Sequence, residues 1–71
     1  MRPKQLRRLW LKWIAGKDWN VGSAIYRQAQ SVLFSIDMVI LNADRDGEAW
    51  ARRDLAKQLA EFSAMRANWR G

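Results

Sequence analysis

The segment from residue 25 to residue 43 constrains the fold most, because its apolar residues recur at intervals that alternate between four and three. These residues are Ile25, Ala29, Val32, Ile36, Val39 and Ala43. An α-helix turns once every 3.6 residues, so this spacing puts their side chains on one face, as in the seam of a coiled coil. Leu33 and Ile40 widen the seam. With Ser23 as a suitable N-cap residue, we expect a helix over about 23–43.

The C-terminal half of this helix carries a second apolar stripe. The outer stripe, as we call it, consists of Phe34, Met38 and Leu41. A helix with two apolar sides needs a neighbour on each of them. We therefore expect this helix to lie at the centre of the fold.

A second long helix is predicted over about 46–69. The large apolar side chains on one of its sides are Leu55, Leu59, Phe62 and Trp69, joined by Ala51. Beside them lies a small-residue ridge that consists of Ala49, Ala56, Ala60, Ser63 and Ala67. Small side chains let a neighbouring helix approach closely, so this helix should also touch two partners. The short loop between the two long helices predicts an antiparallel helical hairpin over 23–69.

A shorter amphipathic helix is expected over about 3–15, because Pro3 suits a first helical turn and Gly16 suits a helix end. Its apolar residues are Leu6, Leu9, Trp10, Trp13 and Ile14. At 100° per residue they share an arc of about 140°. We expect this helix to cover the outer stripe, either in its own chain or in a second copy.

The expected fold class is all-α, with a single small domain over residues 1–71. It consists of the basic amphipathic helix within 1–17, a connector at 18–22 and the hairpin. A chain of this size gains on the order of 3–5 kcal/mol from its core. The absence of cysteine and histidine excludes disulfides and zinc sites built on those residues. We therefore expect the three helices of each chain to assemble with a second copy as a dimeric bundle.

The stretch NADRDG at 42–47 matches the first half of a calcium-binding loop of the EF-hand type, at three ligand positions and the glycine position. The position of the bidentate carboxylate, however, is Arg53. A cation therefore stands where the metal needs an acid. The pattern favours a turn around Gly47 in which Asp44 or Asp46 caps the following helix, and we expect no metal ion.

The net charge of +6 is concentrated near the N-terminus, since residues 1–20 hold six Lys or Arg and one acid. Cations along the amphipathic helix are suited to neutralising the phosphates of a nucleic acid, which gives salt-dependent affinity without sequence readout. The residues expected to make these contacts are Lys4, Arg7, Arg8, Lys12 and Lys17. Two alternatives stay open: a solvated or protein-contacting face, and a helix that lies on a membrane surface.

Apolar residues support a second hypothesis, in which the chain docks on another protein. Trp10 and Trp13 are predicted as core filler, with docking on a partner as the alternative. Trp50 falls among charged residues of its helix, where it packs on the neighbouring loop, anchors a partner or stacks on a nucleic-acid base. The candidate interface residues are therefore Trp10, Trp13, Trp50, Phe34, Met38 and Leu41.

Two charged residues lie near apolar faces. Arg66 falls within the apolar arc of its helix, and Asp37 flanks the outer stripe. Half-buried charges need partners. A cross-helix ion pair is one interpretation, and extension of each side chain to the rim is the other.

Catalytic chemistry has little basis in the sequence. General acid–base catalysis would fall to Asp37, Asp54 or Glu61, none of which has a second carboxylate at a useful spacing. The serines lack a histidine to activate them. We expect a non-enzymatic protein without a cofactor or a small-molecule substrate. The most apolar run, at 32–41, is shorter than the ~20 residues of a membrane span, and we expect a cytoplasmic protein.

In size and plan, a helical hairpin that turns at LNADRDGEAW, residues 41–50, is similar to the small plasmid-encoded RNA-binding hairpins that dimerise into four-helix bundles. The resemblance covers architecture and the loop, without residue-level motifs. The tryptophan-rich N-terminal helix departs from that plan.

The leading hypothesis is a small helical regulator that binds nucleic acid through its basic N-terminal helix. The alternative is an adaptor, an inhibitor or a subunit of a larger complex that docks through exposed tryptophan and apolar helix surface. The third is action at a membrane surface.

Overall fold

The computed structural model describes residues 2–16 and 23–68, and every regular element in these two stretches is an α-helix. The helices are α1 at Pro3–Ala15, α2 at Ala24–Leu41 and α3 at Glu48–Asn68. The predicted all-α class with three helices is therefore confirmed. Lys17, Trp69 and the connector at 18–22 lie outside the described residues.

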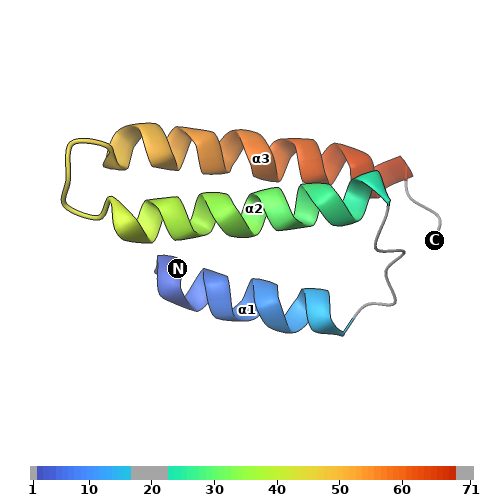
Figure 1. Cartoon of the computed structure of the whole chain (residues 1–71). Helices are drawn as coiled ribbons and strands as arrows, with labels where there is room; N and C mark the ends of the chain where they lie inside the picture. Colours follow the sequence, from blue (N-terminus) through green and yellow to red (C-terminus); the bar gives the residue numbers. More distant parts are fainter. Residues whose placement is uncertain (1, 17–22, 69–71) are drawn as a thin grey trace.

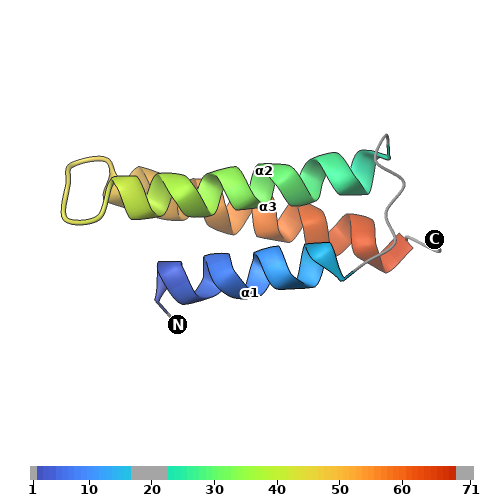
Figure 2. The ribbon, with the colours of Figure 1, turned by 60° about the horizontal axis from the view of Figure 1, so that its bottom comes forward.

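The helices are arranged around α2. Figure 1 shows α3 returning along α2 after the loop at 42–47, while α1 runs along another side of α2 in the opposite direction to it. In the turned view of Figure 2, α1 and α3 both lie below α2. α2 is therefore central, as its two apolar sides predict, and its two neighbours leave one flank of it uncovered.

Side-chain hydrogen bonds set both ends of α2, at or near the boundaries that the sequence predicts. Ser23 is the N-cap, and its Oγ accepts a hydrogen bond from the backbone N–H of Tyr26 at 3.2 Å. At the other end, the side-chain amide of Asn42 donates to the carbonyl oxygen of Met38 at 2.8 Å. α2 therefore ends two residues earlier than expected. In consequence Ala43, which we predicted as the last residue of the seam, is exposed in the loop.

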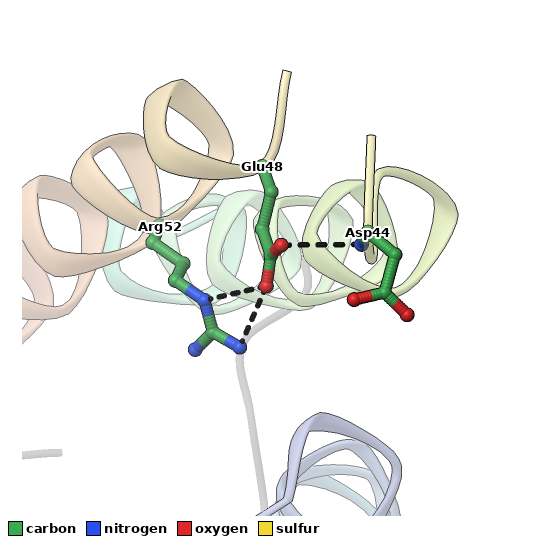
Figure 3. A network of polar contacts seen from close by, with 3 residues as sticks. All are labelled: Asp44, Glu48 and Arg52. Atoms are coloured by element: carbon green, nitrogen blue, oxygen red, sulfur yellow. Dashed lines mark hydrogen bonds and ion pairs between the residues drawn. The ribbon is translucent and has the colours of Figure 1, made fainter. Parts of the chain in front are cut away.

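The turn into α3 is closed by a glutamate, where we predicted an aspartate. Figure 3 shows the carboxylate of Glu48 between the two residues that it binds. It accepts a hydrogen bond from the backbone N–H of Asp44 at 3.1 Å and another from Nε of Arg52 at 3.2 Å. Within the described part of the chain, no hydrogen bond joins the side chain of Asp44 or Asp46 to the start of α3. The predicted aspartate cap is therefore wrong, and α3 begins two residues later than expected.

Gly47 is needed in this turn because the side chain of Asn42 leaves no space for a Cβ atom. The conformation of its backbone is not the reason, since its φ is not positive. A Cβ atom at Gly47 would lie 2.7 Å from Oδ1 of Asn42. The Asn42 side chain cannot move away without losing its hydrogen bond to Met38. The left-handed residue of the turn is Asp44, with a φ of 60°, a conformation that aspartate tolerates better than most residues.

The interior of the molecule follows the seam of α2. The buried apolar residues are Ile14, Ile25, Ala29, Val32, Ile36, Val39, Ala51 and Phe62. Apart from Ala43, every residue of the predicted seam is among them, while Leu33 and Ile40 are half-buried. Full burial of a large aliphatic side chain stabilises the fold by roughly 1.5–3 kcal/mol, so this seam contributes most of the apolar core.

Polar side chains fix α2 against α3. Ser35 is 2% exposed and donates from Oγ to a carboxylate oxygen of Asp54 at 2.8 Å. Nε2 of Gln28 donates to both the backbone carbonyl oxygen and the side-chain oxygen of Gln58, at 3.0 Å and 2.8 Å. A buried polar group destabilises a fold unless it is hydrogen-bonded. These bonds therefore favour one register of the two helices.

Aromatic side chains hold α1 against both other helices. Nε1 of Trp10 donates to the backbone carbonyl oxygen of Ala29 in α2 at 3.0 Å. The Trp10 and Trp13 rings both meet the Phe62 ring of α3 edge to face, with ring centroids 5.0 Å and 5.5 Å apart. Such ring pairs contribute about 0.5–1.5 kcal/mol beyond the area that they bury. α1 is thus docked by contacts to two helices at once.

The position of α1 differs from our expectation, because α1 does not cover the outer stripe of its own chain. Phe34 and Leu41 are 65% and 63% exposed, and Met38 is half-buried. α1 packs instead where Trp10 and Trp13 meet the Phe62 ring of α3 and Nε1 of Trp10 reaches the carbonyl oxygen of Ala29. The small-residue ridge of α3 is exposed as well, so within one chain it does not receive the second neighbour that we predicted.

Substitutions of a seam residue and of an outer-stripe residue should therefore differ sharply in their effect on stability. Ile36 is fully buried, and Ile36→Ala should lower the free energy of unfolding by about 2–5 kcal/mol. Leu41→Ala should change it by no more than ~0.5 kcal/mol. Urea denaturation followed by circular dichroism measures both. Equal losses in the two variants would contradict this packing.

Candidate functional site

The cations of α1 lie on its outer side. The exposed basic residues from 2 to 16 are Arg2, Lys4, Arg7, Arg8 and Lys12, and this stretch contains no acidic residue. Because Trp10 and Trp13 face inward, helical periodicity turns the residues on the opposite side of α1 to solvent. We call Lys4, Arg8 and Lys12, which are spaced four apart, the basic ridge. Four of the five predicted phosphate-contacting residues are thus accessible, and the fifth, Lys17, lies outside the described residues.

An open hollow of about 390 Å³ lies where the start of α1 meets the end of α2. The side chains that line it are Lys4, Arg7, Arg8, Asp37, Ile40 and Leu41. Three cations against one carboxylate give the hollow a positive potential that attracts anions. Ile40 and Leu41 add an apolar wall. We refer to it as the basic hollow. The sequence identified its cations, but it did not indicate that they meet the outer stripe at Leu41.

An ion pair between helices borders the basic hollow. Nε of Arg7 donates to Oδ1 of Asp37 at 2.5 Å, and the two side chains are 44% and 39% exposed. The sequence offered an ion pair of Asp37 with Arg66 as one interpretation, but Asp37 pairs with Arg7 instead. Arg66 takes a different position, with its guanidinium carbon 5.1 Å from the centroid of the Trp13 ring. Arg7 is therefore partly neutralised within the chain, whereas no ion pair is found for Lys4 or Arg8 among the described residues.

Trp10 and Trp13 serve mainly to hold α1 in place. Both are half-buried and interlock with Phe62, which agrees with their prediction as core filler. Both also line a second hollow of about 260 Å³ between α1 and α3. Leu9 lies at its rim and is 53% exposed.

Three of the four remaining candidate interface residues are exposed, and the fourth, Met38, is half-buried. Phe34 and Leu41 are mostly exposed, and Trp50 of α3 is 60% exposed. This exposure favours the interpretation of Trp50 as a surface residue over close packing on the neighbouring loop. Exposed large apolar side chains on a small domain are typical of contact surfaces when they are contiguous.

The loop at 42–47 does not gather metal ligands. Among residues 2–16 and 23–68, no group of three or more acidic side chains is placed to hold a metal ion. In the same two stretches, no helix combines the length and the apolar composition that crossing a membrane requires.

Comparisons with known proteins gave no relative. No family model matches the sequence, and neither a curated protein nor a solved structure matches it significantly. The resemblance in plan to RNA-binding hairpins therefore has no matched protein behind it, and the functional argument depends on the geometry of the chain itself.

The Arg7–Asp37 ion pair should make a small, salt-sensitive contribution to stability. A double-mutant cycle with Arg7→Gln and Asp37→Asn isolates it. Because both side chains are partly exposed, we expect a coupling free energy of about 0.2–1 kcal/mol that declines as salt is added. Thermal or urea denaturation of the four proteins measures it. A coupling that is insensitive to salt would contradict the exposed position of the pair.

Proposed function

We propose that the protein is a small, non-enzymatic binding protein whose α1 contacts the phosphates of a nucleic acid. Lys4, Arg8 and Lys12 make the principal contacts, with Arg7 beside them. The observation that carries this proposal is that the inward packing of Trp10 leaves the whole basic ridge exposed on a rigid helix. Phosphate contacts of this kind give affinity that depends on salt and little on base sequence.

The same observation favours nucleic acid over a membrane surface. An amphipathic helix binds a bilayer by burying its apolar face among the lipids. Much of the apolar face of α1 is already occupied, since Trp10 and Trp13 contact Phe62 and Ile14 is buried, although Leu9 stays 53% exposed. Binding to lipid in that manner would require α1 to leave the core, whereas binding to phosphates requires no rearrangement.

Neutralising the basic ridge should reduce the salt dependence of binding. Each phosphate contact contributes about 0.7–0.9 to the slope of log affinity against log salt concentration. The double variant Lys4→Ala, Arg8→Ala should therefore lower the magnitude of this slope by about 1.4–1.8 for DNA or RNA. Fluorescence polarisation at several salt concentrations measures it.

The chain offers a matched control on α3. Arg53 and Lys57 are also one arginine and one lysine four residues apart, and both are exposed. Arg53→Ala, Lys57→Ala removes the same charge from a different helix. It should leave the slope close to that of the wild type. Equal effects of the two double variants would show that only the net charge matters and would reject α1 as the site.

A second candidate function is docking on another protein chain, of which a second copy is the simplest case. It is favoured by the outer stripe, because Phe34 and Leu41 are mostly exposed on the flank of α2 that faces neither α1 nor α3. In this proposal, two helical hairpins pack through their α2 flanks as a dimeric bundle. Trp50 provides a further anchor at the loop end of α3, since tryptophan is enriched at the centres of interfaces.

Light scattering distinguishes this candidate. A dimer should have about twice the chain mass of 8.3 kDa, and Phe34→Ser combined with Leu41→Ser should convert it to a monomer, because the apolar contact is lost. A wild-type protein that remains monomeric at high concentration would exclude the dimer. A dimer that persists in the double variant would place the interface elsewhere.

A further inference from the structure

We infer that the nucleic acid bound by this protein is single-stranded, and that its bases lie on the outer stripe while its phosphates lie on the basic ridge. This inference rests on the proposed function and deepens it. It is based on the position of an apolar side chain next to the cations, which phosphate binding alone does not require. Leu41, an exposed apolar residue, lines the same hollow as Lys4, Arg7 and Arg8.

The helices that carry the two sets of side chains pack against each other, and the two sets meet at the basic hollow through Lys4, Arg8 and Leu41. α1 and α2 run antiparallel (Figure 1), so the direction from Lys4 to Lys12 along α1 is also the direction from Leu41 to Phe34 along α2. The rise of 1.5 Å per residue gives the basic ridge a length of about 12 Å and separates Leu41 from Phe34 by about 10 Å. A cationic track and an apolar track of similar length therefore start together at the basic hollow.

Cations beside apolar or aromatic side chains are the combination that proteins use to hold single strands. The cations follow the sugar–phosphate backbone, and the base faces stack on the neighbouring rings. In a duplex the base faces are covered by their neighbours in the stack. A duplex could therefore use the basic ridge but not Phe34, whereas a single strand could use both.

The charged side chains around the hollow predict where the phosphate and the base of a nucleotide would lie. Arg7 holds the carboxylate of Asp37 in place at the hollow. The negative charge of this carboxylate disfavours a phosphate on the α2 side of the hollow. Lys4 and Arg8 attract the phosphate to the α1 side of the hollow. The base or sugar then faces Ile40 and Leu41, which form the apolar wall. The hollow of about 390 Å³ is comparable to ligand-sized clefts, which measure roughly 300–1,000 Å³.

The outer stripe favours this occupant over a purely apolar partner because of its surroundings. Leu41 shares the hollow with Lys4 and Arg8, for which no ion pair is found among the described residues, and a buried contact with an uncharged surface would leave these two cations poorly solvated. A polyanion satisfies both the charges and the apolar side chains. A second copy of the chain would supply no such polyanion, since the chain itself carries a net charge of +6.

The test compares fluorescently labelled oligothymidylate with a DNA duplex that carries the same number of phosphates, both titrated with the full chain at the same low salt concentration. The wild type should bind the single strand more tightly than the duplex. Phe34→Ser and Leu41→Ser should each weaken binding of the single strand by about fivefold or more. Neither substitution should change binding of the duplex, because its bases do not reach the stripe.

The controls separate stacking from general apolar contact. Leu9→Ser removes an exposed apolar side chain that lies outside the outer stripe and should leave both affinities unchanged. Phe34→Trp keeps a ring and should retain binding of the single strand, whereas Phe34→Leu keeps only apolar surface and should weaken it. Circular dichroism should show unchanged helix content in every variant, since the substituted side chains are exposed.

The outcomes distinguish this inference from the proposed function. Equal affinity for single strand and duplex, unaffected by Phe34→Ser, would overturn the inference, while a loss of both affinities in Lys4→Ala, Arg8→Ala would still support phosphate binding by α1. No binding of either nucleic acid at low salt would overturn both. A wild-type dimer that Phe34→Ser and Leu41→Ser convert to a monomer would show that a second copy occupies the stripe, which also overturns the inference.

Discussion

The structure depends on one constraint, which is that the seam of α2 must be shared between two neighbouring helices. Ala29 and Val32 are fully buried, and α2 contacts both α1 and α3. The side chain of Ala29 is small enough for Trp10 to reach the backbone carbonyl oxygen of Ala29 itself. That hydrogen bond and the ring contacts with Phe62 fix the rotation of α1 about its own axis. Once the tryptophans face inward, the periodicity of the helix leaves the cations of α1 no position except the outside.

The same packing explains why apolar side chains of α2 remain exposed. Two neighbours approach α2 from the sides that carry Ala29 and Ser35, as the bonds to Trp10 and Asp54 show. A helix with two neighbours still has a flank that neither of them covers, and Phe34 lies on it. The start of α1 lies along the edge of this flank, so Lys4 and Leu41 line one hollow. Exposed cations and exposed apolar side chains therefore meet as a consequence of how the core is closed.

The sequence was sufficient for the helices and the seam, because both follow from periodicity and local capping, as at Ser23. It was not sufficient for the position of α1. The apolar face of α1 fits either side of α2 by pattern alone, and the outer stripe of the same chain was the wrong choice. The tertiary contact of Trp10 and Trp13 with Phe62 decided between them, and no local pattern encodes it. The exposed cations of the site could be predicted because they follow from the periodicity of α1. The ion pair of Arg7 with Asp37 and the basic hollow could not be predicted, because both depend on where α1 packs.

Stability alone does not account for the outer stripe. Burying Phe34 or Leu41 would each have stabilised the fold by roughly 1.5–3 kcal/mol, a large fraction of the stability available to so small a domain. Exposed, they contribute little, and polar residues at these positions would support α2 equally well, because its helical hydrogen bonds and its seam do not involve them. The basic ridge is likewise unnecessary for the core. Lys4 and Arg8 of the basic ridge line one hollow with Leu41 of the outer stripe, although the core needs none of them. The single-stranded nucleic acid that we propose as the ligand would give these cations and this apolar side chain a common purpose.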